Sequence, residues 1–263
     1  MQHTGEKIKK KISTAVFRVI CLGVKVFYPH IRCEGTENLP DEPYIAVGNH
    51  AKTNGPISCE FYYPGSHYTW TAAEMMNFKE VPAYTYEDFW GEKPGYIKWY
   101  FKILSYIIAP LAYCVFDNAK CIGVYHDMRV ISTFRDSVAK LEEGAAVVIF
   151  PEHDVPYNNL LWEFQDRFVD TARMYYRKTG KDINFVPMYV APRLKTLYFG
   201  KPVKYDHTAP KEEERERITN AMMNGVTELA ENLPEHTVVP YPNMPKKLYP
   251  TNKEVRINCE SAD

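Results

Sequence analysis

Residues 141–152 read LEEGAAVVIFPE, and this stretch decides the fold class. Its apolar run, Ala145–Phe150, is typical of a strand buried on both faces of a parallel sheet. Gly144 suits the end of a preceding helix, because apolar residues recur at helical spacing from Ile131 to Leu141. Pro151 and Glu152 then open a polar loop, so the stretch predicts a helix, a buried strand and a polar loop in succession.

The same alternation extends to both sides of this stretch. Short apolar and β-branched runs predict further strands, at Tyr44–Val47, Tyr68–Ala72, Cys121–Tyr125, Phe185–Val190 and Thr196–Phe199. Apolar residues at helical spacing predict further helices, at Tyr96–Phe116 (kinked at Pro110), Leu161–Tyr175 and Lys211–Leu233. Strands that alternate with helices indicate an α/β fold with a mostly parallel central sheet flanked by helices.

Composition limits the class of protein. The chain has 263 residues, a formal net charge of −1 and 45% hydrophobic residues, which is typical of a globular protein and argues against nucleic-acid binding. None of its six cysteines forms a C-x-x-C pair, so a zinc ribbon is excluded and reduced, cytosolic thiols are expected. Shifts in composition predict three segments: a basic amphipathic helix in 1–32, an α/β domain in 33–235 and a proline-rich extended tail in 236–263.

The N-terminal arm concentrates positive charge. Residues 1–32 hold seven lysines and arginines against one glutamate, a net charge of +6. Apolar residues at helical spacing predict an amphipathic helix over Glu6–Phe27, which either packs on the core or lies on an anionic membrane surface. The apolar stretch Ile103–Phe116 is interrupted by Ser105 and Pro110 and is shorter than the ~20 residues that span a bilayer, so no transmembrane helix is predicted. No signal-peptide cleavage site is evident.

Polar loops follow three predicted strands, where the ligand crevice of an open α/β sheet lies. His50, in the first loop, has the right chemistry for a general base, and Arg129, in the second, can hold a phosphate through its planar fork. In the third loop Glu152, His153 and Asp154 could orient a hydroxyl, a phosphate or a proton relay. We expect His50, Arg129 and Glu152 to converge at one edge of the sheet.

The order of these motifs resembles a known family. Asn49-His50 matches the start of N-H-x4-D, and Phe150-Pro151-Glu152 matches the start of F-P-E-G-T-R-S. Residues 123–129 follow G-x-x-F-x-x-R except at the phenylalanine position, which is Tyr125 or His126 depending on the alignment. Val186-Pro187 and Gly200-Lys201-Pro202 match a later V-P segment and the glycine-proline strand after it. In this order, between Val26 and Pro202, the chain resembles the glycerolipid acyltransferases typified by 1-acylglycerol-3-phosphate acyltransferase.

The resemblance implies a mechanism and partners. His50 would take a proton from an acceptor hydroxyl, which attacks the thioester of acyl-CoA or acyl carrier protein, with no other cofactor. The acceptor would be a lysophospholipid or a glycerol-phosphate-type molecule in phospholipid biosynthesis. The protein would act at an anionic phospholipid surface, as a cytoplasmic enzyme peripheral on the inner face of the cell membrane. The residues expected to bind substrate are Asn49, Asn54, Arg129, Pro151 and Glu152.

Two departures from the family pattern leave the activity open. Gly55 stands where the family has the aspartate that orients the histidine, and His153-Asp154 replaces the G-T-R-S part of the third motif. In the first interpretation the site is rewired: His153 and Asp154 join His50 as catalytic residues, and Asp154, or Asn54 as second choice, orients the imidazole.

Two other interpretations compete with the rewired enzyme. The chain could be a catalytically degenerate protein of the same fold that binds lipid or acyl groups without turnover. A metal-dependent hydrolase is the third, since the loops contain ligand types at His50, His126, Asp127, His153 and Asp154. No H-x-x-x-H or H-x-H spacing supports it, so no metal site is expected.

Overall fold

The structure of the protein is a computed structural model that describes residues 2–91 and 93–254. The chain forms two compact units, which are described separately. The first comprises Met1–Pro29 and Trp70–Thr133, and the second comprises His30–Thr69 and Phe134–Asp263. This division groups residues 70–133 with the N-terminal helix, whereas the composition placed the segment boundaries after 32 and 235.

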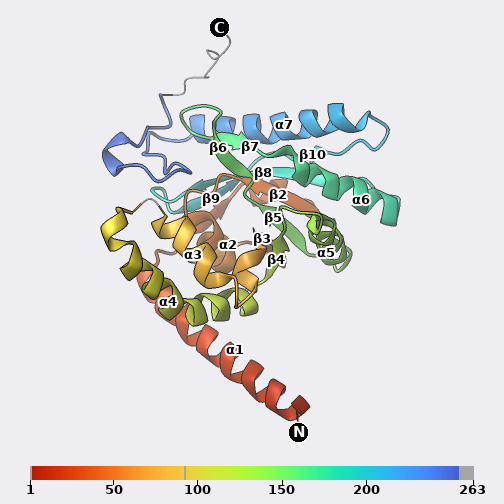
Figure 1. Cartoon of the computed structure of the whole chain (residues 1–263). Helices are drawn as coiled ribbons and strands as arrows, with labels where there is room; N and C mark the ends of the chain where they lie inside the picture. The colour runs from red at the N-terminus through yellow and green to blue at the C-terminus, as the bar shows by residue number, and fades with distance from the viewer. Residues whose placement is uncertain (1, 92, 255–263) are drawn as a thin grey trace. The chain divides into compact units, whose positions relative to one another are not determined.

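A mostly parallel sheet forms the centre of the second unit (Figure 1). Strand β2 (Tyr44–Gly48) pairs in parallel with β5 (Ala146–Ile149) and β8 (Asn184–Ala191). Strand β3 (His67–Ala72) pairs in parallel with β5, and β1 (Arg32–Glu34) pairs in parallel with β9 (Thr196–Phe199). Only β9 and β10 (Val203–Lys204) run antiparallel to β8. The order is β1, β9, β8, β2, β5 and β3, with β10 also on β8. The predicted α/β class is confirmed.

Register brings two of the predicted loops to the same edge of the sheet. Val47 of β2 lies opposite Ile149 of β5, so the two strands end side by side. Because the strands are parallel, the residues after Gly48 and those after Ile149 leave the sheet at the same carboxyl edge. The loop with His50 and the loop with Glu152 are therefore neighbours.

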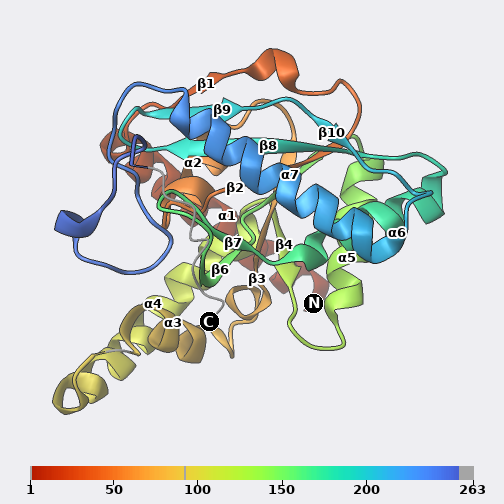
Figure 2. The ribbon, with the colours of Figure 1, turned by 90° about the horizontal axis from the view of Figure 1, so that it is seen from above.

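Helices cover both faces of the sheet in the second unit. Successive residues of a strand point to opposite faces. Met188 of β8 contacts Cys59 of α2 (Asn54–Tyr62), whereas a Cβ on Gly225 of α7 (Lys211–Glu231) would lie 2.8 Å from Pro187. Figure 2 shows α7 crossing over β8. The other helical elements of the unit are η1 (Thr36–Asn38), η4 (Asp166–Val169), α6 (Asp170–Thr179), η5 (Lys246–Leu248) and the part of α5 (Val130–Glu142) from Phe134 onward.

The first unit is mainly helical. Its elements are α1 (Gln2–Phe27), η2 (Ala73–Met76), α3 (Val81–Trp90), η3 (Gly95–Ile97), α4 (Lys98–Asn118) and β4 (Cys121–Val124). Helices α1 and α4 are joined by polar contacts: the Asn118 amide donates to Ser13 Oγ at 2.8 Å, and Lys10 Nζ pairs with Asp117 Oδ2 at 2.7 Å. The helix predicted over Glu6–Phe27 is confirmed and begins earlier, at Gln2.

The apolar segment of α4 is longer than the sequence predicted. Pro110 lies inside the helix without ending it, and with η3 the helix runs from Gly95 to Asn118. Within the described residues, this one helix, of 24 residues, is long and apolar enough to cross a membrane by length and composition. The sequence predicted a shorter apolar stretch because Ser105 and Pro110 were taken as interruptions, whereas the helix continues through both residues.

A predicted helix is partly replaced by a hairpin. The sequence placed a helix over Leu161–Tyr175, but β6 (Glu152–Pro156) pairs antiparallel with β7 (Trp162–Phe164), and the helical part begins only at Asp166 with η4 and continues in α6. The buried side chain of Asn158 accepts hydrogen bonds from the backbone of Leu160 and Leu161, both at 2.8 Å, and so fixes the turn. Leu161 and Phe164 thus reach the core from a hairpin, and their helix-like spacing was misleading.

Candidate functional site

His50 leaves the sheet in a direction that Asn49 fixes. The buried Asn49 side chain donates to the carbonyl of Val190 at 3.1 Å and accepts from the N–H of Val190 at 2.7 Å. These two bonds continue the pairing of β2 with β8 by one residue beyond the end of β2. Asn49, which the sequence named as a substrate-binding residue, therefore supports the backbone from which His50 projects.

The loop after His50 turns back on the imidazole. Ala51 and Lys52 both have left-handed backbone conformations, with φ of 46° and 56°. Such conformations cost free energy in residues other than glycine and concentrate at functional sites. Here they bring the carbonyl of Lys52 into hydrogen-bond contact with Nδ1 of His50. Because a carbonyl can only accept, Nδ1 carries the proton and Nε2 keeps its lone pair.

This contact corrects the predicted orienting group. The sequence named Asp154, with Asn54 as second choice, as the substitute for the missing aspartate. The partner of His50 Nδ1 is instead the backbone carbonyl of Lys52. A carbonyl in this position selects the same tautomer as a carboxylate would, but it contributes no full negative charge.

Packing accounts for the glycine at the aspartate position. A Cβ on Gly55 would lie 2.7 Å from the carbonyl oxygen of His50 and 2.8 Å from Cε1 of Phe150. The Phe150 ring packs edge-on against the imidazole, with 5.4 Å between the ring centroids. A side chain at position 55 therefore has no space, and Phe150 and Lys52 hold the histidine.

Glu152 locks the loop from the other strand end. Its side chain is only 6% exposed, and its two oxygens accept from two backbone amides: Oε2 from His50, and Oε1 from Trp162 at 3.2 Å. Burial raises the pKa of Glu152 to about 7, although the hydrogen bonds from the two amides act in the opposite direction. The backbone of Pro151 also accepts from Gln165 at 2.9 Å. Pro151 and Glu152 thus join the His50 loop to the hairpin.

The surroundings of His50 favour a neutral ring. Burial lowers the pKa of His50 from its ordinary value of 6.5, and the hydrogen bond to Lys52 raises it by a smaller amount. Tyr241, from the C-terminal segment, stands edge-on to the imidazole with ring centroids 6.0 Å apart. A neutral imidazole with one nitrogen held by a carbonyl is the form that can act as a general base.

The remaining predicted residues of these loops have other neighbours. His153 Nε2 lies 3.5 Å from Glu163 Oε2 across the hairpin, and Asp154 is exposed. The Asn54 amide donates to the carbonyl of Ala51 at 2.8 Å, which supports the left-handed turn. Neither Asp154 nor His153 is therefore the hydrogen-bond partner of His50 Nδ1.

Arg129 belongs to the first unit, where its own neighbours occupy it. Its Nε and Nη2 lie 3.0 Å and 2.9 Å from Oδ2 of Asp127, and its guanidinium lies 4.5 Å from the ring centroid of Tyr125. The hydrogen bond between the two side chains raises the pKa of Arg129 and lowers that of Asp127. Both side chains are exposed, so a phosphate would have to compete with Asp127 for this guanidinium.

Sequence reasoning missed several groups near His50. The orienting carbonyl of Lys52 has no sequence signal, since every residue has a carbonyl. Tyr241 lies almost 200 residues away, in a tail that the sequence placed on the surface. Among the described residues, no cluster of three or more histidine, cysteine, aspartate or glutamate side chains is placed to hold a metal ion.

Comparisons with known proteins give a likeness to a solved structure. No family model matches the chain, and no curated protein matches it. Among solved structures, the crystal structure of the 1-acyl-sn-glycerophosphate (LPA) acyltransferase PlsC from Thermotoga maritima aligns over 89% of this chain and 85% of that chain, with 18% identity and a TM-score of 0.44. At this sequence identity and TM-score, the likeness gives no information about the activity of this chain. The function is therefore inferred from the geometry around His50.

Proposed function

We propose that the protein is an O-acyltransferase that moves a fatty acyl group from a thioester donor to a hydroxyl of a glycerolipid-type acceptor. The observation that carries the proposal is the oriented imidazole of His50, whose Nδ1 is held by the Lys52 carbonyl, and burial lowers its pKa, which favours the neutral form. An acceptor hydroxyl is a poor nucleophile until a base removes its proton. The order of the motifs Asn49-His50 and Phe150-Pro151-Glu152 favours acyl transfer from acyl-CoA or acyl carrier protein as the reaction in which this base acts.

The proposed reaction balances with this one base. Nε2 of His50 takes the hydroxyl proton as the oxygen attacks the thioester carbonyl, which forms a tetrahedral intermediate. When the intermediate collapses, the carbon–sulfur bond breaks, and the imidazolium returns its proton to the thiolate. An ester and a free thiol result, and His50 is again neutral. The fixed tautomer matters because only Nε2 has a lone pair to accept the proton.

The acceptor class is supported by the exposed surface of the first unit. Large apolar side chains of η3 and α4 recur at intervals of three and four residues and are more than half exposed, at Tyr96, Trp99, Tyr100, Ile103, Tyr106, Ile107 and Leu111. On α1 Val19, Leu22 and Phe27 are also mostly exposed, and Lys11, Arg18 and Lys25 are exposed on the same helix. Apolar surface combined with basic residues fits the interface of an anionic bilayer. We infer that this unit holds the enzyme peripherally on the inner face of the cell membrane.

A transfer assay tests the proposed reaction. Purified protein would be incubated with acyl-CoA or acyl carrier protein donors and with lysophosphatidate, glycerol 3-phosphate or lysophospholipid acceptors in vesicles. We expect ester formation with at least one pair, and a loss of about 10²–10⁴-fold in the His50→Ala variant. Transfer that persists in His50→Ala would contradict the role of His50. Donor binding without any transfer would favour the degenerate acyl-binding protein.

Sedimentation with vesicles tests the membrane inference. We expect the wild-type protein to pellet with anionic vesicles in low salt and much less with neutral ones. Val19→Glu combined with Ile107→Glu should abolish pelleting. Met128→Glu is the matched control, because Met128 is 93% exposed in the same unit but lies outside α1 and α4. Equal pelleting with both vesicle types, unchanged by salt, would contradict the inference.

A further inference from the structure

The C-terminal segment forms a loop that is closed at its base. Thr237 and Thr251 form an antiparallel bridge, and the N–H of Val238 donates to Pro250 at 2.9 Å. The wholly buried Asn252 accepts from the N–H of His236 at 2.8 Å and donates to the carbonyl of Ala230 at 2.7 Å. Residues 239–250, called the strap below, are therefore held at both ends.

The strap reaches the His50 loop through three residues. Tyr241 stands against the imidazole, Asn243 Oδ1 accepts from Lys52 Nζ at 3.4 Å, and the same ammonium lies 5.4 Å from the ring centroid of Tyr249. These contacts involve the residue whose carbonyl orients His50. The strap is thus part of the wall of the site, although the sequence predicted a tail that only crosses the surface.

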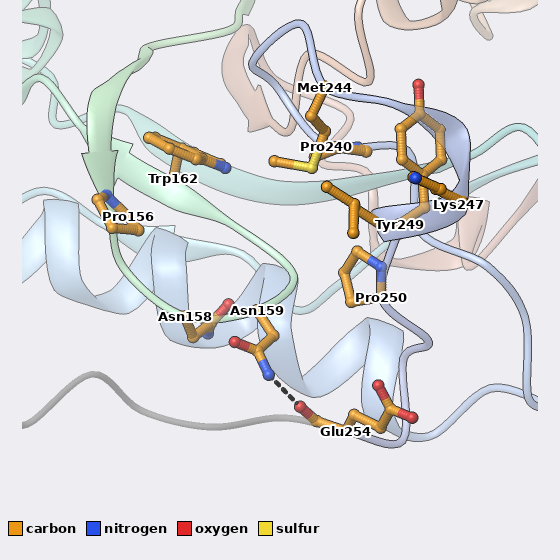
Figure 3. Close-up of a pocket in the computed structure, with 11 residues that line it drawn as sticks. Pro156, Asn158, Asn159, Trp162, Pro240, Met244, Lys247, Tyr249, Pro250 and Glu254 are labelled. Carbon is orange, nitrogen blue, oxygen red and sulfur yellow. Dashed lines mark hydrogen bonds between the residues drawn. The ribbon is translucent and has the colours of Figure 1, made fainter.

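A cavity of about 470 Å³ lies between the strap and the β6–β7 hairpin. In Figure 3, Pro156 and Trp162 of the hairpin face Met244 and Lys247 of the strap. The hydrogen bond from the Asn159 amide to the carbonyl of Glu254, at 2.6 Å, joins the hairpin to the residues that follow the strap. Trp162 also connects the cavity to the site, because its ring centroid is 6.5 Å from that of Tyr241, which contacts His50.

The lining defines the ligand chemistry. Proline, methionine and tryptophan side chains offer apolar surface for a slender chain, and Asn159 offers an amide for hydrogen bonds to a ligand's own amides. Lys247 and Glu254 are both exposed and place a positive and a negative charge at the cavity. A volume of this size fits a small ligand. A flexible chain with internal amides and one anionic end matches these features.

We propose that this cavity holds the phosphopantetheine arm of the acyl donor, with its phosphate at Lys247 and its thioester end directed past Tyr241 to His50. The inference rests on the proposed function, because only a thioester donor brings such an arm to His50. The arm is common to coenzyme A and acyl carrier protein, so the cavity serves either donor. Trp162 packs along the arm, and Lys247 pairs with its phosphate.

Direct binding tests the cavity independently of transfer. Isothermal titration of the full chain would use coenzyme A, 4′-phosphopantetheine and adenosine 3′,5′-bisphosphate as separate probes. We expect the first two to bind, and Lys247→Glu and Trp162→Ala each to weaken both by about tenfold. Lys246→Glu is the matched control: it makes the same charge change on the adjacent exposed residue, which does not line the cavity, and should change the dissociation constants less than twofold. Thermal unfolding of each variant verifies that it is folded.

Steady-state kinetics tests whether the cavity serves the donor, acyl-CoA or acyl carrier protein, during transfer. KM for the donor in use, acyl-CoA or acyl carrier protein, should rise by about tenfold in Lys247→Glu, while kcat changes little. Absence of phosphopantetheine binding, equal effects of Lys246→Glu and Lys247→Glu, or binding of adenosine bisphosphate alone would overturn the cavity proposal. His50-dependent transfer with unaffected binding in the variants would overturn the cavity and leave the proposed function. Binding that depends on Lys247 and Trp162 without any transfer would support the cavity proposal and overturn the proposed function.

Discussion

The two predicted sites of ionisable residues in this protein are built in opposite ways. In the second unit, His50 and Glu152 are far apart in the sequence, and the buried carboxylate accepts from the backbone of the histidine loop. In the first unit, Arg129 and Asp127 are two residues apart, and both are exposed to solvent. One pair exists only because a parallel sheet ends its strands together, whereas the other forms within a single turn.

The difference determines how strongly the surroundings shift the pKa values of the residues in each site. Around His50 burial dominates: it lowers the pKa of the imidazole and raises that of Glu152 to about 7. Around Arg129 the largest influence on the pKa is the hydrogen bond to its local partner, Asp127. Groups with perturbed pKa values in a buried setting are candidates for catalysis, and an exposed local ion pair contributes little to stability. The comparison therefore favours His50 as the functional centre.

The largest effect is expected from removing Glu152. Glu152→Ala leaves the backbone amides of His50 and Trp162 buried without acceptors, which costs about 2–4 kcal/mol of unfolding free energy. The His50 loop also loses its link to the hairpin, so transfer should fall by at least tenfold. Urea unfolding and the transfer assay measure the two effects. Wild-type stability in this variant would show that the carboxylate does not hold the loop.

The pH dependence of stability tests whether burial raises the pKa of Glu152. Because the folded-state pKa of Glu152, about 7, exceeds its ordinary value of 4.5, the folded protein holds this proton more tightly than the unfolded chain. Its contribution to stability is therefore greatest below pH 4.5 and is lost as pH rises to about 7, by roughly 3 kcal/mol. Glu152→Gln cannot titrate, so the difference in stability between the two proteins should change over this pH range. A constant difference would contradict the raised pKa.

A smaller loss is expected at Gly55. Gly55→Ala adds a Cβ against the His50 carbonyl and the Phe150 ring, and such overpacking costs about 1–3 kcal/mol. The comparison variant is Gly95→Ala, where a Cβ meets nothing within 4 Å. Thermal unfolding of both variants measures the effect, and Gly55→Asp should not raise activity. A gain of activity in Gly55→Asp would show that the loop can accept the carboxylate after all.

The smallest effect is expected at Arg129. Arg129→Gln removes an exposed local pair, so the unfolding midpoint should not change measurably. If the guanidinium releases Asp127 to hold a phosphate, KM for a phosphate-bearing acceptor should rise severalfold, with kcat unchanged. Acceptor titrations with lysophosphatidate and with an acceptor that lacks phosphate test this. A clear drop in the unfolding midpoint would show that the exposed Arg129–Asp127 pair stabilises the fold, which contradicts the proposed difference from the buried Glu152 contacts.

The sequence predicted the parts of the site that depend on local pattern. The buried run Ala145–Phe150 and the motif Asn49-His50 located two strand ends, and the parallel sheet brought His50 and Glu152 together as expected. The hairpin β6–β7 was not predicted, because Leu161 and Phe164 have helical spacing but are held by long-range pairing. The contribution of Tyr241 was also missed, since nothing in a proline-rich tail indicates where it folds back.

By itself the sequence determined the α/β class, the central strands, the amphipathic N-terminal helix and the identity of the candidate base. These follow from the periodicity of apolar residues and from residue chemistry, which are local properties of the chain. Only the tertiary structure decided that the Lys52 carbonyl orients His50, that Gly55 has no room for a side chain, and that the strap forms a wall of the site. Such features depend on backbone direction and on contacts between distant segments, and no residue type encodes either one.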